Sequence, residues 1–334
     1  MIPFLIGIPA VLAVVFQIVR NEKIRGYIVY AGAGAIMAMT VVFIADWIGG
    51  GAKTWMFYPR TETIDHLMTA GDIFLMCLIV WLSVRYKRVL PMILSILQTV
   101  LVLYVEFTAE MTEGPHMMVD WLTILMCIII AFIGGFICIY TVGYMKGYHQ
   151  HHKDVKDRQP FFFSMLFLFL AAMFGLVLSQ NLIWIYFFWE ITSVISFLMI
   201  GYTRTEEAVG NSFCALWMNL LGGLGFAIAI VLMALGQESL QLTEVVSTGA
   251  LLPLMCLSLA GLTKSAQLPF STWLLGAMVA PTPSSALLHS ATMVKAGVYL
   301  LIRISPALSG NLVGLIVSSI GGLTFIMASM MAIA

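Results

Sequence analysis

Two lysines lie inside long apolar segments, where a positive charge is costly. Lys264 occurs in LTKSAQLPF and Lys295 in HSATMVKAGVYLLIR. On insertion scales a charged side chain at the centre of a bilayer costs roughly 2.5–3.5 kcal/mol, so such residues usually carry a function or are paired. Glu190, in YFFWEITSVISFLMIGY, is a buried carboxylate that could supply the partner.

The chemistry that these three residues predict is a proton relay. Burial disfavours the charged form of a lysine, whereas a nearby carboxylate favours it. Glu190 close to Lys264 would hold that lysine protonated, and separating the two would release the proton toward Lys295 or water. The alternative for Glu190 and Lys264 is a static ion pair that only fixes the register of two helices.

Three further side chains are candidates for the same path. His289 precedes Lys295 by six positions, about 600° of helical turn, so the two would face different sides of one helix and need not share a site. A packing role for His289 remains the alternative. Tyr299 lies one turn after Lys295 on the same face and is a candidate accessory residue. Asp72 is either a water-facing carboxylate or a proton-pathway acid.

The elements that must position these residues are transmembrane helices. The 334 residues are 61% hydrophobic and 10% charged, with a mean hydropathy of +1.01, whereas soluble domains carry about 25% charged residues. Apolar runs of roughly 20 residues, enough to span a bilayer as a helix, recur along the chain. We count eleven, at 1–19, 27–48, 66–84, 89–107, 117–145, 160–178, 181–202, 211–235, 249–275, 283–303 and 310–334. The sequence therefore predicts an all-α polytopic bundle; a β-barrel would show short alternating segments instead.

One of these helices is expected to be broken. Pro269 follows Lys264 by a few residues, and proline removes a backbone donor and kinks or ends a helix. Within a membrane, such a break is tolerated only where protein or a water-filled cavity satisfies the freed groups. Pro281 and Pro283 end the connection to the next helix. Lys264 is thus predicted to lie where water can enter.

The loop charges predict the orientation. Basic residues follow alternate helices: Arg20, Lys23, Arg25, Arg85, Lys87, Arg88, Lys146, Lys153, Lys156, Arg158 and Arg204. The opposite loops hold few basic residues (Lys53, Arg60 and, at a helix end, Arg303) and five acids: Glu106, Glu110, Glu113, Glu238 and Glu244. The positive-inside rule then places the amino terminus outside and the basic loops in the cytoplasm.

Cofactor and metal signatures are not apparent in the sequence. All five cysteines lie within predicted spans without a CxxC pair, which argues against an iron–sulfur cluster. No glycine-rich nucleotide fingerprint occurs. His149, His151 and His152 lie in a polar stretch beside lysines and aspartates, and we interpret them as solvated rather than as metal ligands. We expect no cofactor and no metal in this chain.

The segments around the buried charges resemble a known family. FFWEITSVISFLMIGY and LTKSAQLPFSTWLLGAMVAPTPSSALLHSATMVKAGVYLLIR are similar to the antiporter-like subunits of complex I, of Mrp-type cation/proton antiporters and of energy-converting membrane-bound hydrogenases. The resemblance runs from about residue 119 to the end. It implies that Glu190, Lys264, Lys295 and His289 lie along a hydrophilic axis at mid-membrane, with a lysine on a broken helix.

The resemblance also implies a division of the chain. The family core contains two inverted five-helix units, and the first would occupy about 160–304 within a core region at 111–309. Residues 1–110 would be a four-helix extension, since the family usually has two helices at this point. Residues 310–334 would be the first helix of a second unit that this chain does not contain, so we expect a fragment.

The resulting hypothesis is an ion-translocating subunit of a redox-driven pump related to complex I, of the NADH dehydrogenase or hydrogenase type, in a prokaryotic cytoplasmic membrane. The redox chemistry would lie in partner subunits, including iron–sulfur proteins and further antiporter-like subunits, with no nucleic acid involved. The alternatives are a Mrp-type sodium/proton antiporter subunit without redox partners, and a structural membrane anchor.

Overall fold

The computed structural model is a bundle of helices, and it describes residues 1–59, 62–108, 114–152 and 155–333, without the side chains of Ser290 and Ala291. Arg60, Glu110, Glu113 and Lys153, used above in the charge argument, lie outside these ranges. Within them, nine helices are long and apolar enough to cross a membrane, and two more are apolar but shorter. The chain is a multi-pass membrane protein, and the eleven predicted spans each correspond to helical structure.

The elements follow one another as a simple series. The helices are α1 (Ile2–Ile18), α2 (Glu22–Gly49), α3 (Glu62–Arg85), α4 (Val89–Thr108), α5 (Trp121–Ile128), α6 (Gly135–His151), α7 (Gln159–Leu178), α8 (Leu182–Ile200), α9 (Glu206–Leu235), α10 (Leu242–Thr248), α11 (Leu251–Lys264), α12 (Thr272–Gly276), α13 (Thr282–Ala286), α14 (Met293–Leu308) and α15 (Leu312–Ile333). Single π-helical turns lie at Ile129–Gly134 and Leu287–Ala291, and 3₁₀ turns at Gly201–Thr203 and Ala277–Val279. The strands are β1 (Trp55–Phe57) and β2 (Met117–Val119).

Polar caps set several helix starts. The Asn181 side chain accepts from the amides of Ile183 and Trp184 at the start of α8. The Asp120 side chain accepts from the amide of Thr123, so α5 begins at Trp121. The predicted start at 117 was wrong, because residues 117–119 pair with β1 as an antiparallel strand. That pairing joins segments about sixty residues apart, and the sequence pattern gave no sign of it.

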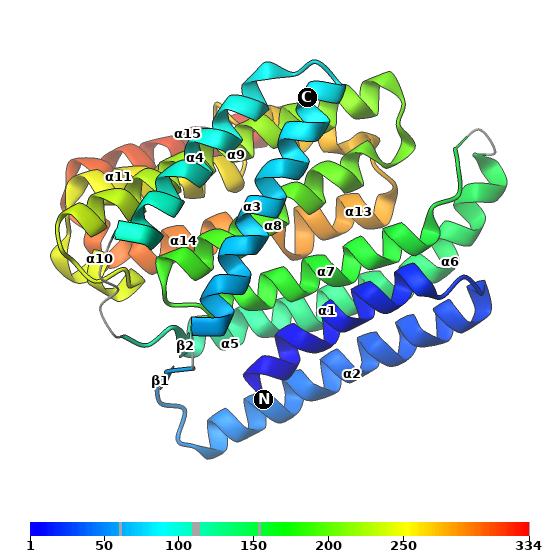
Figure 1. Cartoon of the computed structure of the whole chain (residues 1–334), viewed down its shortest axis with the longest axis horizontal. Helices are drawn as coiled ribbons and strands as arrows, with labels where there is room; N and C mark the ends of the chain where they lie inside the picture. The colour runs from blue at the N-terminus through cyan, green and yellow to red at the C-terminus, as the bar shows by residue number, and fades with distance from the viewer. Residues whose placement is uncertain (60–61, 109–113, 153–154, 334) are drawn as a thin grey trace.

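The helices form two groups around a buried centre. Figure 1 shows α1 and α2 at one edge of the bundle, where α1 packs on α7 and α2 on α6. On another side α3 and α4 pair with each other, α4 packs on α9, and α3 contacts α8. Helices α7 and α8 lie between these groups and are almost wholly buried, whereas α15 is almost wholly exposed. The candidate residue Glu190 lies on the enclosed helix α8.

The start of α2 changes the assignment of two basic residues, Lys23 and Arg25, which both lie within the helix. The helix begins at Glu22 rather than at 27, so Arg25, counted above as a loop charge, lies within it and is buried. Its guanidinium donates to Gln159 Oε1 at 2.8 Å, at the start of α7. This bond ties the first helix pair to the buried centre.

The predicted break is present, and α11 ends at Lys264 itself. Ala266 then takes a left-handed conformation, with φ of 54°, and the chain does not become helical again until α12. Backbone groups at the break are satisfied by protein. The amide of Leu268 donates to Thr324 Oγ1 at 3.0 Å, and Trp273 Nε1 donates to the carbonyl of Thr263 at 3.0 Å. An interrupted backbone at membrane depth needs such partners.

Candidate functional site

Glu190 lies in the middle of α8 and is held by an amide from another helix. Gln98 of α4 donates from Nε2 to Glu190 Oε2 at 2.8 Å, and both side chains are buried. Glu190 Oε1 and Gln98 Oε1 receive no hydrogen bond from any described residue. Gly223 of α9 packs directly against these two oxygens. A Cβ at Gly223 would lie 2.5 Å from Glu190 Oε1 and 2.7 Å from Gln98 Oε1.

Lys264 reaches α8 from the end of the broken helix. It is fully buried, and its Nζ donates to the carbonyl of Trp189 at 3.0 Å and to Ser193 Oγ at 2.8 Å. The ammonium also lies 4.8 Å from the centre of the Trp189 ring. Two neutral oxygens and an aromatic face therefore solvate the charge at the C-terminal end of a helix, where the helix dipole favours a positive charge.

Glu190 and Lys264 are neighbours without forming a contact ion pair. Lys264 bonds the residue just before Glu190 and the residue three positions after it, yet no nitrogen–oxygen pair within 4.0 Å joins the two side chains among the described residues. Glu190 instead bonds Gln98, toward α4. The static ion pair considered above is thus not the arrangement seen. Each charge has its own neutral partners and is not locked by the other.

Lys295 and His289 lie on two segments rather than on one regular helix. The π-helical turn that carries His289 is separated from α14 by Thr292, whose φ is −144°. His289 and Lys295 are therefore not separated by about 600° of one continuous helix, as the sequence predicted. Lys295 is half-buried in the first turn of α14, and no described residue pairs with its side chain. His289 Nε2 is buried and receives no hydrogen bond within the described residues.

A row of small hydroxyls connects Lys264 with the start of α14. Ser193 and Ser196 lie one turn apart on α8. Ser193 binds Lys264, and Ser196 contacts the sulfur of Met293, two residues before Lys295. Close packing brings α11 and α14 together, because a Cβ at Gly297 would lie only 3.1 Å from that of Lys264. The fold therefore gathers Glu190, Lys264 and Lys295 onto adjoining helices.

The two accessory candidates have different surroundings. Asp72 is buried in α3, and no described residue donates to its Oδ2. Tyr299 is buried in α14 and donates to the carbonyl of Val177 at 2.8 Å, at the end of α7. The Tyr299 ring lies under the Arg303 guanidinium, 4.9 Å from its centre. This contact joins Tyr299 to a cluster at the membrane end rather than to Lys295.

Sequence reasoning missed Gln98, Ser193 and Gly223. Gln98 is the one with a local signal, since it is an amide inside the apolar run LSILQTVLV. Ser193 and Gly223 are small residues that helices use for close packing, so their types alone carry no functional signal. Only the pairing of helices shows that these residues touch the buried charges.

The structure also changes the interpretation of the three histidines. Helix α6 continues to His151, so two of them are helical, and the His149 side chain is only 12% exposed. His149 Nε2 lies 3.1 Å from Tyr202 Oη and 3.5 Å from an oxygen of Asp157. The solvated interpretation was therefore wrong for His149. Across the described residues, no group of three or more histidine, cysteine or acidic side chains could hold a metal ion.

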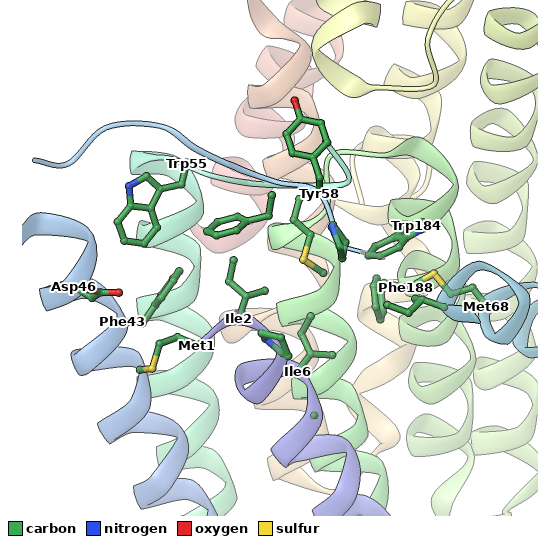
Figure 2. A pocket seen from close by; sticks show the side chains of 16 residues that line it. Met1, Ile2, Ile6, Phe43, Asp46, Trp55, Tyr58, Met68, Trp184 and Phe188 are labelled. Atoms are coloured by element: carbon green, nitrogen blue, oxygen red, sulfur yellow. The ribbon is translucent and has the colours of Figure 1, made fainter. Parts of the chain in front are cut away.

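An apolar pocket of about 520 Å³ lies at the opposite end of α2 from that histidine cluster. Figure 2 shows Ile2 and Ile6 of α1 between Phe43 of α2 and the side chains of Trp184 and Phe188 of α8. Among the described residues that line it, Asp46 supplies the one carboxylate. The pocket suits an apolar group and does not contain the buried charges.

Two family models match the chain. Residues 179–334 match the family described as NADH:quinone oxidoreductase/Mrp antiporter, TM, and residues 110–154 match the one described as NADH-Ubiquinone oxidoreductase (complex I), chain 5 N-terminus. The first match contains Glu190, Lys264, His289 and Lys295.

Bacterial relatives agree with these matches. The chain is 40% identical over 196 residues to Na(+)/H(+) antiporter subunit A1 of Staphylococcus haemolyticus (strain JCSC1435), covering 56% of this chain and 23% of that protein. It is 37% identical over 224 residues to the putative antiporter subunit mnhA2 of Staphylococcus aureus (strain USA300 / TCH1516), covering 64% and 27%. The chain thus spans about a quarter of the length of these curated relatives.

Solved structures show the same fold. A chain of the membrane-bound sulfane sulfur reductase, an archaeal respiratory membrane complex, superimposes with a TM-score of 0.66 at 14% identity, covering 91% of this chain and 52% of that one. A chain of the Mrp complex from Dietzia sp. DQ12-45-1b gives 0.54 at 26% identity, covering 75% and 29%. The fold and the sequence matches together place this protein among the antiporter-like membrane subunits of the complex I and Mrp family.

Proposed function

We propose that this chain moves protons, alone or in exchange for sodium ions, along Glu190, Lys264 and Lys295. The observation that carries the proposal is the position of Lys264. Its ammonium is fully buried at the end of a broken helix, and it bonds the turn of α8 that bears Glu190 without a locking ion pair. A charge held by neutral oxygens can change its protonation when its neighbour changes. His289 would serve as a further proton-accepting group beyond Lys264.

For the assembly, the named relatives favour a Mrp-type sodium/proton antiporter. Both relatives described above are named as antiporter subunits, one of them as a Na(+)/H(+) antiporter subunit. The second candidate is the redox-driven pump inferred from the sequence, with iron–sulfur partners of the NADH dehydrogenase or hydrogenase type. The description of the matching family, which includes NADH:quinone oxidoreductases, favours this candidate.

The topology belongs to the same proposal. We infer a prokaryotic cytoplasmic membrane with the amino terminus outside, supported by the basic residues that follow α1, α3 and α6. Helices α7 to α14 would form the first five-helix unit, at about 160–304. The helices of residues 1–110 would be the extension, and α15 would begin a second unit.

Replacing Lys264 tests the relay. In everted membrane vesicles containing the whole assembly, Lys264→Ala should lower the pH change that follows a sodium pulse by about a hundredfold, the range for loss of a positioned proton carrier. Lys23→Ala, which removes an exposed lysine, is the matched control and should transport normally. Normal transport by a normally expressed Lys264→Ala variant would favour the structural anchor instead.

Purification separates the two assemblies. Extraction of the tagged chain with its partners in mild detergent should yield a complex without iron or flavin if the antiporter assignment is correct. Iron–sulfur or nickel proteins in stoichiometric amounts would instead establish the redox-driven pump. The Lys264→Ala variant tests the relay in either assembly, because the proposed relay residues are the same in both.

A further inference from the structure

A second set of carboxylates lies on the α3 and α4 side of Glu190. Asp72 in α3 is 4% exposed and lies within Coulombic reach of Glu190 and of Glu106. Glu106, counted above among the loop acids, lies in the last turn of α4 with Oε2 buried. Asp65, in the first turn of α3, is among the groups near Glu106. Asp72 thus links Glu190 on α8 with Glu106 on α4, and Glu106 in turn lies near Asp65.

These acids lie along one line from the membrane face inward. Asp65, Thr69 and Asp72 are spaced by four and three residues, which places them on the same face of α3. Asp65 Oδ1 accepts from Trp184 Nε1 at 2.7 Å, which ties the start of α3 to the first turn of α8. Asp72 is about 15 Å further in than the first residue of α3, close to the middle of a bilayer of about 30 Å. The line therefore connects a surface with the depth of the buried charges.

Several oxygens along this line are buried and unpaired. Within the described residues, nothing donates to Asp72 Oδ2, Gln98 Oε1 or Glu190 Oε1. Thr69 of α3 is the hydroxyl near the Glu106 carboxylate, and Thr99 of α4 is the one near Tyr186 Oη. Gln98 and Tyr186 are 2% and 1% exposed. The Gln98 and Glu190 oxygens converge, since both lie within 2.7 Å of the Cβ position of Gly223. Acceptor oxygens that converge without a donor are a site for a proton or a cation.

We propose that Asp65, Glu106 and Asp72 form a half-channel that carries cations between the membrane face at the start of α3 and Glu190. Gln98 and Tyr186 line its inner end. The cation is a proton or Na⁺, both of which bind carboxylate oxygens. The proposal rests on the function proposed above and adds its entry route, which in the inferred orientation opens outside. The pocket of Figure 2 reaches α3 at Ile64 and Met68 but is apolar, so it does not supply this route.

Neutral substitutions test the route in the vesicle assay. Asp72→Asn and Glu106→Gln should each lower transport at least tenfold, and Asp72→Glu should restore part of it, because a carboxylate returns to the line. Glu62→Gln, on the exposed surface of the same helix, is the matched control and should be unchanged. Transport by the Lys264→Ala variant is measured in the same assay.

The outcomes separate the two proposals. If Asp72→Asn and Glu106→Gln transport normally while Lys264→Ala is inactive, the half-channel is wrong and the relay stands. If Lys264→Ala is also active, the relay itself is wrong. If Asp72→Asn and Asp72→Glu are equally inactive although both assemble normally, Asp72 is a structural residue and the route is overturned.

Thiol labelling tests water access without relying on transport. In a Cys77→Ala background, Thr69→Cys should react with a charged, membrane-impermeant thiol reagent added from the face where α3 begins, because only a hydrated thiol ionises. Phe74→Cys, whose native side chain is 66% exposed on the outer surface of α3, should not react. Equal reaction of both thiols, or of neither, would contradict the half-channel.

A carbodiimide identifies the cation. Dicyclohexylcarbodiimide adds to protonated carboxylic acids in apolar surroundings, so it should label Asp72 or Glu106 of the intact assembly. Protection by Na⁺ would show that the half-channel carries sodium, and labelling that Na⁺ leaves unchanged would show that it carries protons. The absence of any label on both residues would count against the route.

Discussion

At the scale of single residues, the proposed relay requires Glu190 to act through its charge, because it forms no contact ion pair with Lys264 among the described residues. Glu190→Gln can keep the hydrogen bond from Gln98 at the same position, yet it removes the negative charge beside Lys264. We expect coupled transport to fall by about ten- to a hundredfold, within the range for a displaced proton-transfer group, and its pH profile to move. Initial rates across pH 6–9 in everted vesicles, the ordinary range of such assays, measure both.

Glu207→Gln is the control for this change, since Glu207 is an exposed acid in the first turn of α9. It should leave both rate and profile as in the unmodified chain. A Glu190→Gln variant with the original pH profile would show that Lys264 does not sense this carboxylate.

At the scale of elements, the crossing of α11 and α14 holds the broken helix end beside Lys295. A Cβ at Gly297 would lie 2.5 Å from the carbonyl oxygen of Gly261 and 2.7 Å from the amide nitrogen of Ser265, and backbone atoms cannot move aside cheaply. Gly297→Ala should therefore destabilise the chain by about 1–3 kcal/mol, the usual effect of overpacking. Thermal unfolding in detergent, followed by tryptophan fluorescence, measures the loss.

The control is Gly143→Ala in α6, where an added Cβ meets nothing within 4 Å. It should unfold at or slightly above the temperature of the unmodified chain, because alanine favours helices. Equal behaviour of the two variants would mean that the α11–α14 crossing is not tightly packed.

At the scale of the whole molecule, a clamp between α14 and the N-terminal cap of α5 joins the two halves of the sequence. Arg303 of α14 donates to both oxygens of Asp120, the cap of α5, and to Thr123 Oγ1 at 2.6 Å. Burial alone would raise the pKa of Asp120, but the bonds from Arg303 and from the Thr123 amide outweigh it and lower that pKa. The clamp is therefore strongest when Asp120 is ionised.

The pH dependence of stability follows from this lowered pKa. Because the folded pKa lies below the unfolded value of about 3.9, the clamp stabilises the fold fully above that value and is lost as pH falls through the folded pKa. Asp120→Asn should lower stability at pH 7 by about 1–3 kcal/mol, as for a hydrogen bond between charged groups. The difference from the unmodified chain should shrink below about pH 4.

Asp46→Asn, which alters an exposed acid at the end of α2, is the control and should not show this convergence. Melting temperatures of both variants between pH 3 and 7, a range that brackets the carboxylate pKa, provide the measurement. A constant difference between Asp120→Asn and the unmodified chain would rule out the ionised clamp.

The sequence by itself determined the membrane class, the eleven helical spans, the break after Lys264 and the choice of Glu190, Lys264 and Asp72 as unusual charges. These conclusions need only local information, because a bilayer requires about 20 apolar residues for each span and penalises every charge within it. Proline likewise acts on its own segment. The same local logic placed the helix boundaries within a few residues.

The tertiary structure alone decided which helix faces and which side chains contact one another. Gln98 and Glu190 are 92 positions apart, and β1 pairs with a strand beyond two intervening helices. Lys264 bonds a backbone carbonyl and Ser193 instead of the carboxylate that the sequence suggested. In lipid, apolar helix faces are nearly equivalent in composition, so packing shape and a few small or polar residues choose the partners. That choice places Glu106 near Asp72, although the sequence suggested that Glu106 is a loop acid.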